Sequence, residues 1–385
     1  MHIAFDGTTL RPGRTGVGYY TEHLLRHAAE QCVEDEISVI SNVAIETTEP
    51  LPARVRRVVA PSWSPRLLWM QTQAPRLLRR LGADVVHFTN GMVPVGAGTP
   101  TVVTIHDMSL TMYPAFHPWR RVVLNRPFVN LAARRADAII TVSDSAKRDI
   151  VRLYGVDTGR VHVVHEAAAP SFRVIREPFE LRRVRERYGL ADRFILYVGT
   201  IEPRKNLPTL IEAFARRRTA GDLPHQLVCA GPYGWLSRDI EALIERLGVR
   251  DAVKFTGYVP FADLPAIYNL AEAFVFPSIY EGFGLPVIEA MACGTPVITG
   301  RVAALNEVAG DAAACLDPLD VDTLGEALVA LTRNRGRREE LARRGIERAR
   351  AFSWERAAAE TLAVYRLAAA DSVTSRAAAP AALQS

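Results

Sequence analysis

The stretch AFVFPSIYEGFGLPVIEAMACGTPVIT, Ala273 to Thr299, carries the clearest indication of the fold class. It opens and closes with short apolar runs, residues 273–276 and 297–299, which are typical of buried strands. Between them the loop EGFGLP allows a tight turn, and a helical pattern follows in which Pro286 suits the first turn and Gly294 the end. Strand, helix and strand in so short a span form a βαβ unit, which predicts a parallel sheet.

The same alternation of apolar runs and helical patterns continues along the chain, as expected of α/β domains. The strand candidates of the first half are His2–Asp6, Ile37–Ser41, Arg56–Val59, Asp84–Phe88, Thr101–Ile105, Ala138–Val142 and Val161–His165. The pattern restarts at RFILYVG (193–199) and continues with Gln226–Ala230, Val253–Phe255, Ala273–Phe276, Val297–Thr299 and Ala313–Leu316. Helical patterns between strands include Val17–Ala29, Leu67–Leu81 and Ser143–Tyr154.

The chain has 385 residues, which is more than one hydrophobic core usually carries. A polar, charged segment, Arg173 to Arg193, interrupts the alternation of strand and helix patterns near the middle of the chain. We therefore predict two doubly wound, Rossmann-like α/β domains that face each other across a cleft, with ligands at the carboxyl ends of their strands. The expected parts are an N-terminal domain (1–175), a second domain (176–352), a last helix (353–370) and a disordered Ala/Ser/Pro-rich tail (371–385).

Composition excludes several classes of protein. The net charge of +5 is mild, and no basic run is interleaved with aromatic residues as nucleic-acid binding would need. A small net positive charge is compatible with phosphate-bearing ligands or an anionic membrane surface. The four cysteines show no Cys-x-x-Cys spacing, which favours neither zinc nor disulfides. With no signal peptide and no apolar run of about 18 residues, we expect a cytoplasmic protein, and peripheral contact with the inner face of the membrane stays open.

The first chemical feature is the acid pair Glu281 and Glu289, which flanks the Gly-Phe-Gly loop. A carboxylate that accepts from two vicinal hydroxyls is a common way to hold a ribose or hexose diol. A plain alternative explains Glu289 as an acid near a helix N-terminus. That alternative does not explain why Glu281 and the Gly-Phe-Gly loop are present.

The second feature is ILYVGTIEPRKNLPTLIEAF, residues 195–214. A buried strand ends at Gly199, and Arg204 and Lys205 precede a helix. Two cations beside a helix N-terminus, at the carboxyl end of a strand, suit a diphosphate. The alternative is a solvated charge pair beside Glu202.

Other segments carry weaker signals. RTGVGYYTEHLL (14–25) opens a helix with Gly16 and Gly18, which would let backbone N–H groups approach an anion or would simply form a turn. His106 follows a strand and could bond a substrate or be structural, and Ser143 is a helix N-cap that could also donate to a phosphate. The Trp- and Arg-bearing helix at 67–81 could lie on a membrane, but its core-facing period favours a packed helix.

Taken together, these motifs resemble the family 4 glycosyltransferases, retaining GT-B enzymes that use nucleotide-sugar donors. EGFGLPVIEAMACGTPVI is similar to the E-x7-E motif of the family, GTIEPRKN to its phosphate loop, and GVGYYTEHLL to its glycine loop. TIHD, TVSDSAKRDI and VKFTGYVP resemble further signatures, and the helix after FSWE resembles the one that crosses back to the first domain. One departure is HEAAAPSF (165–172), which stands where many relatives read Asn-Gly-Val-Asp.

The resemblance implies a role for each matching residue. The catalytic set would be His106 and Glu281 at the sugar, with Arg204 and Lys205 at the diphosphate leaving group. Glu289 would hold the ribose. The other donor-binding residues would be Gly16, Gly18, Ser143, Gly199, Tyr258, Val259, Phe283, Gly284 and Leu285. The implied mechanism is a front-face attack in which the departing phosphate accepts the proton of the acceptor, without a metal or a cofactor.

The resemblance thus implies a hexosyltransferase that acts on a saccharide acceptor, lipid-linked by expectation, in the synthesis of a bacterial surface polysaccharide. GDP-mannose is the favoured donor, although UDP-glucose or a dTDP sugar would need few changes. The acceptor would meet residues 90–92 and 109–118. Two alternatives stay open: a GT-B sugar-nucleotide epimerase, and an inactive sugar-nucleotide-binding subunit of a polysaccharide assembly complex.

Overall fold

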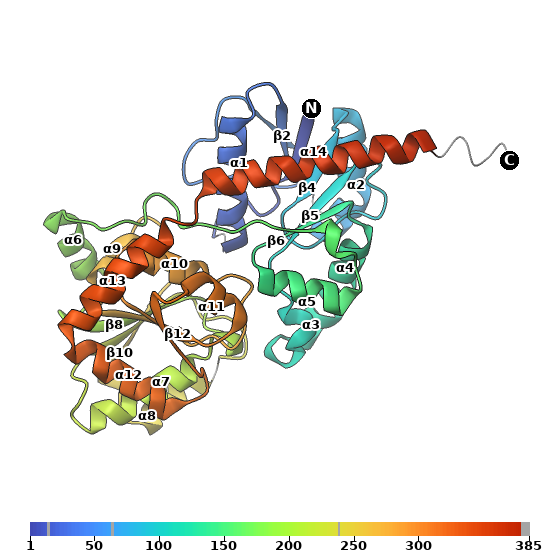
Figure 1. Cartoon of the computed structure of the whole chain (residues 1–385). Helices are drawn as coiled ribbons and strands as arrows, with labels where there is room; N and C mark the ends of the chain where they lie inside the picture. Colours follow the sequence, from blue (N-terminus) through green and yellow to red (C-terminus); the bar gives the residue numbers. More distant parts are fainter. Residues whose placement is uncertain (14–15, 63–64, 238, 379–385) are drawn as a thin grey trace. The chain divides into compact units, whose positions relative to one another are not determined.

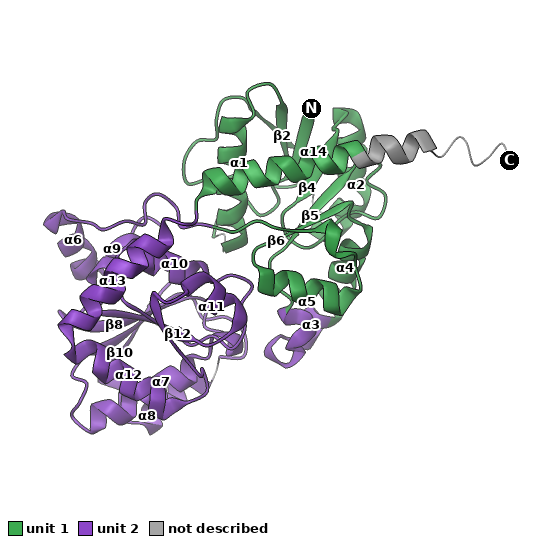
Figure 2. Ribbon diagram, in the orientation of Figure 1, with its two compact units in different colours: residues 1–108, 123–166, 353–385 green, residues 109–122, 167–352 purple. Residues whose placement is uncertain are grey.

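The computed structural model describes residues 1–13, 16–62, 65–237 and 239–378, and these form two compact units (Figures 1 and 2). Unit 1 comprises Met1–Met108, Val123–Glu166 and Ser353–Ser385. Unit 2 comprises Ser109–Val122 and Ala167–Phe352.

Unit 1 is built on a parallel sheet with seven strands among the described residues, in the order β3-β2-β1-β4-β5-β6-β7. The strands are β1 (His2–Asp6), β2 (Glu36–Ser41), β3 (Val55–Val59), β4 (Val85–Phe88), β5 (Thr101–Ile105), β6 (Ala138–Thr141) and β7 (Val161–Val163). The helices that lie wholly or largely in the unit are α1 (Gly16–Gln31), α2 (Arg66–Leu81), α4 (Trp119–Arg135), α5 (Asp144–Tyr154), η2 (Thr158–Arg160) and α14 (Trp354–Ala378).

Unit 2 holds a second parallel sheet, with six strands among the described residues in the order β10-β9-β8-β11-β12-β13. The strands are β8 (Phe194–Val198), β9 (Gln226–Ala230), β10 (Val253–Gly257), β11 (Ala273–Phe276), β12 (Val297–Gly300) and β13 (Ala313–Leu316). Its helices are α3 (Ser109–Met112), η1 (Pro114–Phe116), α6 (Pro178–Tyr188), η3 (Pro203–Lys205), α7 (Leu207–Thr219), α8 (Asp239–Arg246), η4 (Arg250–Ala252), α9 (Leu264–Leu270), α10 (Leu285–Ala292), α11 (Ala303–Ala309), α12 (Val321–Arg333) and α13 (Arg335–Ala349).

The strand order positions the functional loops. In each sheet the order of the strands reverses at the first strand of the unit. In unit 1, β1 lies between β2 and β4, and in unit 2, β8 lies between β9 and β11. Neighbouring strands there send their connections to opposite sides, which leaves a crevice at the carboxyl ends. The loops after β1 and β4, and those after β8 and β11, begin at this point of their own sheet.

The predicted α/β fold with two Rossmann-like domains is confirmed, and the strands match closely because runs of Val, Ile and Phe are buried on both faces of a parallel sheet. Predicted and observed bounds coincide for β1, β5, β9, β11 and β13. The helix at 67–81 is a packed one, as the period of its residues favoured: in α2, Trp69 and Met70 are fully buried.

The unit boundaries differ from the expected ones. Unit 2 begins at Ala167 rather than at residue 176, and it includes Ser109–Val122. The charged segment 173–193 is not a plain linker, because it holds α6.

The C-terminal end differs as well, because α14 continues to Ala378, past the expected end at residue 370. The eight added residues, DSVTSRAA, include only two alanines, but they directly follow the three alanines at 368–370, so the extension continues a segment of strong helix formers. The rest of the expected tail, 379–385, lies outside the described residues, as do Arg14 and Thr15 of the glycine loop. Within the described part of the chain, no helix combines the length and apolarity that crossing a membrane requires.

Candidate active site

Two strand-end loops of unit 2 pack directly against each other. One runs from the end of β8 through η3 to α7, and the other runs from the end of β11 to α10. The backbone N–H of Ile279 donates to the carbonyl of Arg204 at 3.0 Å, and the Asn206 side chain donates to the carbonyl of Pro277 at 3.2 Å. The two loops are therefore held as one structure at the carboxyl edge of the sheet.

Local backbone conformation explains two glycines in these loops. Gly284 has φ of +107°, and a Cβ placed on it would lie 2.4 Å from the Leu305 side chain. Gly231, after β9, has φ of +145°, and its Cβ would lie 2.1 Å from the carbonyl oxygen of Gly199. A larger residue at 284 would therefore push the start of α10 away from Leu305 of α11, and one at 231 would push the loop after β9 away from the end of β8.

An ion cluster, defined as Glu202, Arg204, Lys205 and Glu281, lies where the two loops meet. Glu281 contacts both cations: Oε1 lies 2.6 Å from Lys205 Nζ, and Oε2 lies 2.7 Å from Arg204 Nη1. Arg204 Nη2 lies 2.8 Å from Glu202 Oε1. Side-chain exposure in the cluster is only 4–12%. The alternative of a solvated Arg-Lys pair is therefore wrong.

Burial and charge compete in this cluster. Burial raises the pKa of the Glu281 carboxyl, but Arg204 and Lys205 outweigh burial and hold that pKa below its usual value. Burial lowers the pKa of Lys205, and Glu281 opposes that shift. The formal charges of the four side chains sum to zero (+2 − 2), so the two cations are held in place by acids rather than by solvent.

Glu289 lies about one turn into α10 and is half-buried. The Tyr268 hydroxyl donates to Glu289 Oε2 at 3.0 Å, which fixes one carboxylate oxygen. Burial and Glu289 together raise the pKa of Tyr268 well above its usual value. Phe283 is buried and packs edge-on against Phe352, and Leu285 begins the helix. Gly294, with φ of +73°, follows its end as predicted.

Tyr258 and Val259 follow β10, which is separated from β8 by β9. Their loop is tied to the loop after β9, because the Gly231 N–H donates to the Gly257 carbonyl at 2.9 Å. Val259 is buried and Tyr258 is exposed. The structure thus places these two residues farther along the sheet edge than the ion cluster.

His106 follows β5 of unit 1 and is held by its own unit. Its Nδ1 lies 3.0 Å from Glu166 Oε1, and its Nε2 lies 3.0 Å from the carbonyl oxygen of Thr89. The ring of Tyr20 packs edge-on against it, with centroids 4.6 Å apart. Burial lowers the pKa of His106, but Glu166 outweighs burial and the pKa is raised. Both ring nitrogens thus have partners within the protein, and the role of His106 at the sugar stays a prediction.

Glu166 is the residue that sequence reasoning missed. It is buried and forms the ion pair with His106 from the segment HEAAAPSF, which drew attention only as a departure from relatives. The sequence signal that could have indicated Glu166 was a charged residue close to the end of a strand, followed by an apolar run.

The remaining predicted residues of unit 1 lie at helix starts. Gly16 begins α1, and a Cβ on it would meet nothing within 4 Å. Gly18 is buried in the first turn. The buried Ser143 caps α5, and its hydroxyl accepts from the Ala146 N–H at 3.0 Å. The capping role is thus observed, and a phosphate contact stays a prediction.

One Asp-x-Asp pair, Asp320 and Asp322, follows β13. Asp320 caps α12 by accepting from the Thr323 N–H at 3.0 Å, and Asp322 pairs with Arg216 at 2.8 Å. Both acids therefore have structural partners. In the described ranges, no group of three or more His, Cys, Asp or Glu residues is arranged to hold a metal ion.

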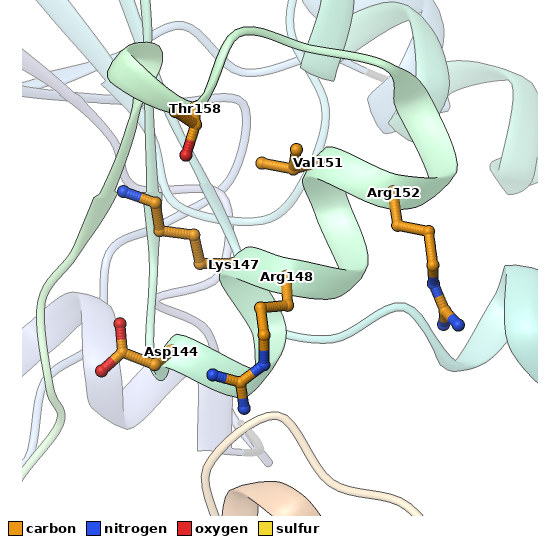
Figure 3. A pocket seen from close by; sticks show the side chains of 6 residues that line it. All are labelled: Asp144, Lys147, Arg148, Val151, Arg152 and Thr158. Carbon is orange, nitrogen blue, oxygen red and sulfur yellow. The ribbon is translucent and has the colours of Figure 1, made fainter.

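A separate pocket of about 330 Å³ lies on α5 (Figure 3). None of the predicted site residues lines it. The lining residues are Asp144, Lys147, Arg148, Val151, Arg152 and Thr158. Arg152 pairs with Asp149 at 2.9 Å, so part of its charge is already matched.

Comparison with known proteins assigns the family. Residues 14–171 match the profile of Glycosyltransferase Family 4, and residues 181–351 match that of Glycosyl transferases group 1. O-antigen chain mannosyltransferase B of Escherichia coli is 33% identical over 384 residues, which cover 95% of this chain and 100% of that protein. MMP alpha-(1->4)-mannosyltransferase of Mycolicibacterium hassiacum is 34% identical over 318 residues, 77% of this chain and 74% of that protein.

A solved structure agrees at the level of fold. Sucrose-phosphate synthase from Thermosynechococcus elongatus superposes with a TM-score of 0.74 at 22% identity, and the match covers 95% of this chain and 98% of that one. The resemblance read from the motifs is thus confirmed, and so is the GT-B architecture. This chain is a glycosyltransferase and belongs to family 4, with a second unit of the group 1 type.

Proposed function

We propose that this enzyme transfers mannose from GDP-mannose, with retention of anomeric configuration, to a lipid-linked saccharide during the assembly of a bacterial surface polysaccharide. The names of two relatives support mannose, because both are mannosyltransferases and both match most of the chain. The name of the Escherichia coli relative supports an O-antigen chain as the type of product.

The ion cluster is the observation that carries the proposal. Arg204 and Lys205, whose side chains are only 12% exposed, follow the carboxyl end of β8, and Glu281 contacts both of them. Negative charge grows on the diphosphate as the glycosidic bond breaks, so cations fixed in advance stabilise the transition state with little reorganisation. Glu289, held by the Tyr268 hydroxyl at 3.0 Å, would accept from the ribose hydroxyls.

In this proposal the departing phosphate oxygen accepts the proton of the acceptor hydroxyl, while the new bond forms on the same face of the sugar. The step needs positive charge at the leaving group more than a general base. Arg204 and Lys205 supply that charge, so we propose that transfer needs no divalent metal. Activity should survive excess EDTA; loss in EDTA with recovery in Mg²⁺ or Mn²⁺ would overturn this assignment.

A donor panel tests the sugar and the base. GDP-mannose, UDP-glucose, UDP-N-acetylglucosamine and a dTDP sugar are each offered with a synthetic lipid-linked saccharide, and the product linkage is read by NMR. We expect transfer from GDP-mannose and an α-linked product from the α-linked donor. A β-linked product, or transfer from another donor alone, would contradict the proposal.

The same panel separates the alternatives. An epimerase would convert the free sugar nucleotide without an acceptor, and an inactive subunit would bind a donor without turnover. The family assignment favours neither. We place the reaction in the cytoplasm at the inner face of the membrane, where a lipid-linked acceptor would be available.

A further inference from the structure

The ring of Phe276 lies against the ammonium group of Lys205. Phe276 is the last residue of β11 and is fully buried. Lys205 Nζ lies over the face of this ring, 4.6 Å from its centroid. The same nitrogen lies 2.6 Å from Glu281 Oε1, and the Lys205 side chain is only 12% exposed. The ammonium is therefore held between a carboxylate and the face of an aromatic ring.

The strand order explains why the ring and the ammonium meet. Strands β8 and β11 are parallel neighbours, so residues that follow β8 lie near the last residue of β11. The Phe276 ring also reaches the end of β8, because a Cβ placed on Gly199 would lie 3.9 Å from its Cε2. The Phe276 carbonyl accepts from the Thr299 hydroxyl at 3.0 Å, and the Phe274 ring stacks on Phe276 with centroids 5.8 Å apart. The sheet thus fixes the ring from several sides.

An aromatic face and a carboxylate both attract the ammonium, but they act on it differently. Burial lowers the pKa of Lys205, and Glu281 opposes that shift. The negative face of a ring also favours the charged form, and does so more strongly where water is excluded. Unlike a second acid, the ring adds no formal negative charge that would repel a diphosphate.

The ring also leaves the hydrogen-bond donors of Lys205 in place. An ammonium has three N–H donors, and Glu281 is the one acceptor of Lys205 among the hydrogen bonds between described residues. Two donors therefore remain for a ligand, on a nitrogen whose position is set by the carboxylate and the ring.

Burial alone does not require a phenylalanine at this position. Phe274, two residues earlier on β11, is equally buried, and its ring packs against Tyr268 and Phe276. Among the residues that the structure describes, a cation lies over the ring of Phe276 but not over that of Phe274. An aliphatic residue of similar volume would also fill the space at 276, so packing does not explain the aromatic face.

We propose that Phe276 is a positioning residue for the reaction, because the face of its ring holds the Lys205 ammonium in place for the diphosphate leaving group. The inference rests on the proposed function, which assigns the leaving group to Lys205. Phe276 itself would contact no substrate. Since it acts through Lys205, its loss should lower the rate of transfer more than the affinity for the donor.

Fluorination of the ring tests the proposal in the full-length enzyme, because fluorine weakens the negative face of a ring and changes its shape little. Phe276 is replaced in turn by monofluoro-, difluoro- and pentafluorophenylalanine, and single-turnover transfer is measured with saturating donor. We expect the rate to fall with each added fluorine, to about 5- to 30-fold below the wild type for the pentafluoro ring. The same series at Phe274 is the matched control and should show no such gradient.

Nuclear magnetic resonance tests the position of the ammonium without any substrate. The chain has only three lysines, Lys147, Lys205 and Lys254, so isotope labelling of lysine at Cε gives three signals, and the variant Lys205→Arg identifies the signal of Lys205. Protons held over a ring face resonate upfield, so the Lys205 signal should be displaced in the wild type. Phe276→Leu should remove this displacement, whereas Phe274→Leu should keep it.

Two outcomes would overturn the proposal: a Lys205 signal that is not displaced in the wild type, or a rate that stays constant across the fluorinated series at Phe276. The fluorinated series also serves if Phe276→Leu fails to fold, because it keeps the ring. If the donor panel identifies a donor other than GDP-mannose, the series is measured with that donor. A displaced signal and a graded rate would then support Phe276 while the proposed donor is refuted, so the two failures are told apart.

Discussion

The substitution Glu281→Gln tests whether the ion cluster is organised by its central acid. At 2.6 Å from Lys205 and 2.7 Å from Arg204, Glu281 is the one carboxylate that contacts both cations among the described contacts. With an effective dielectric constant of about 20, its attraction to Lys205 alone is on the order of 6 kcal/mol before desolvation is counted. Removing one partner from a buried pair typically costs about 3–5 kcal/mol, and glutamine keeps one acceptor.

We therefore expect Glu281→Gln to lower the free energy of unfolding of unit 2 by about 3 kcal/mol. For a unit of this size that corresponds to a fall in Tm of about 6–12 °C. The formal charge of the cluster would rise from zero to +1, so GDP should bind at least as tightly as to the wild type. Transfer should nevertheless slow, because the two cations would no longer be held in one arrangement.

Differential scanning calorimetry with and without GDP measures the first two quantities, and single-turnover transfer measures the third. The matched control is Glu326→Gln, which removes an acid from an exposed pair with Arg217 at 3.5 Å. That pair lies on the surface of the same unit and should be worth less than about 1 kcal/mol. If Glu281→Gln unfolded at the wild-type temperature, or lost GDP affinity together with rate, the organising role of Glu281 would be refuted.

Three further results are expected. Lys205→Ala should lower the single-turnover rate by about 10²–10³ with a smaller effect on donor affinity; a change in donor affinity alone, by calorimetry, would make Lys205 a binding residue only. Glu289→Ala should weaken GDP binding by about 1.5–3 kcal/mol, and wild-type affinity in calorimetry would exclude the ribose contact. The raised pKa of His106 stabilises the fold below the unfolded pKa of about 6.5, and this contribution is lost as pH rises through the folded value. Glu166→Gln should therefore lower the pKa of His106 in NMR titration and flatten stability over that pH range; an unmoved pKa would disprove the coupling.

Local pattern was enough to predict the strands and the position of the two loops. Runs such as Phe194–Val198 and Ala273–Phe276 are hydrophobic at every position, which is typical of a parallel strand buried on both faces. Because β8 and β11 are neighbours, the cations after one strand and the acids after the other were also bound to lie near one edge.

Contacts between distant residues could not be read in the same way. His106 and Glu166 are sixty residues apart in the chain, and no sequence pattern in either segment predicts that they contact each other. Nor does a local pattern tell which unit a short segment packs in, which is why Ser109–Val122 was expected in the first domain.

The last long helix has a consequence for how the chain is made. In α14, the Tyr365 hydroxyl lies 2.6 Å from Nδ1 of the buried His87 in β4, a partner 278 residues earlier in the chain. Unit 2 is complete in sequence once residue 352 has left the ribosome, whereas unit 1 still lacks the helix that packs against α1. The half of the enzyme that is synthesised first is therefore the half that is finished last. A chain truncated before α14 would keep the complete sequence of unit 2, whereas unit 1 would lack the helix that supplies the Tyr365 hydroxyl to His87.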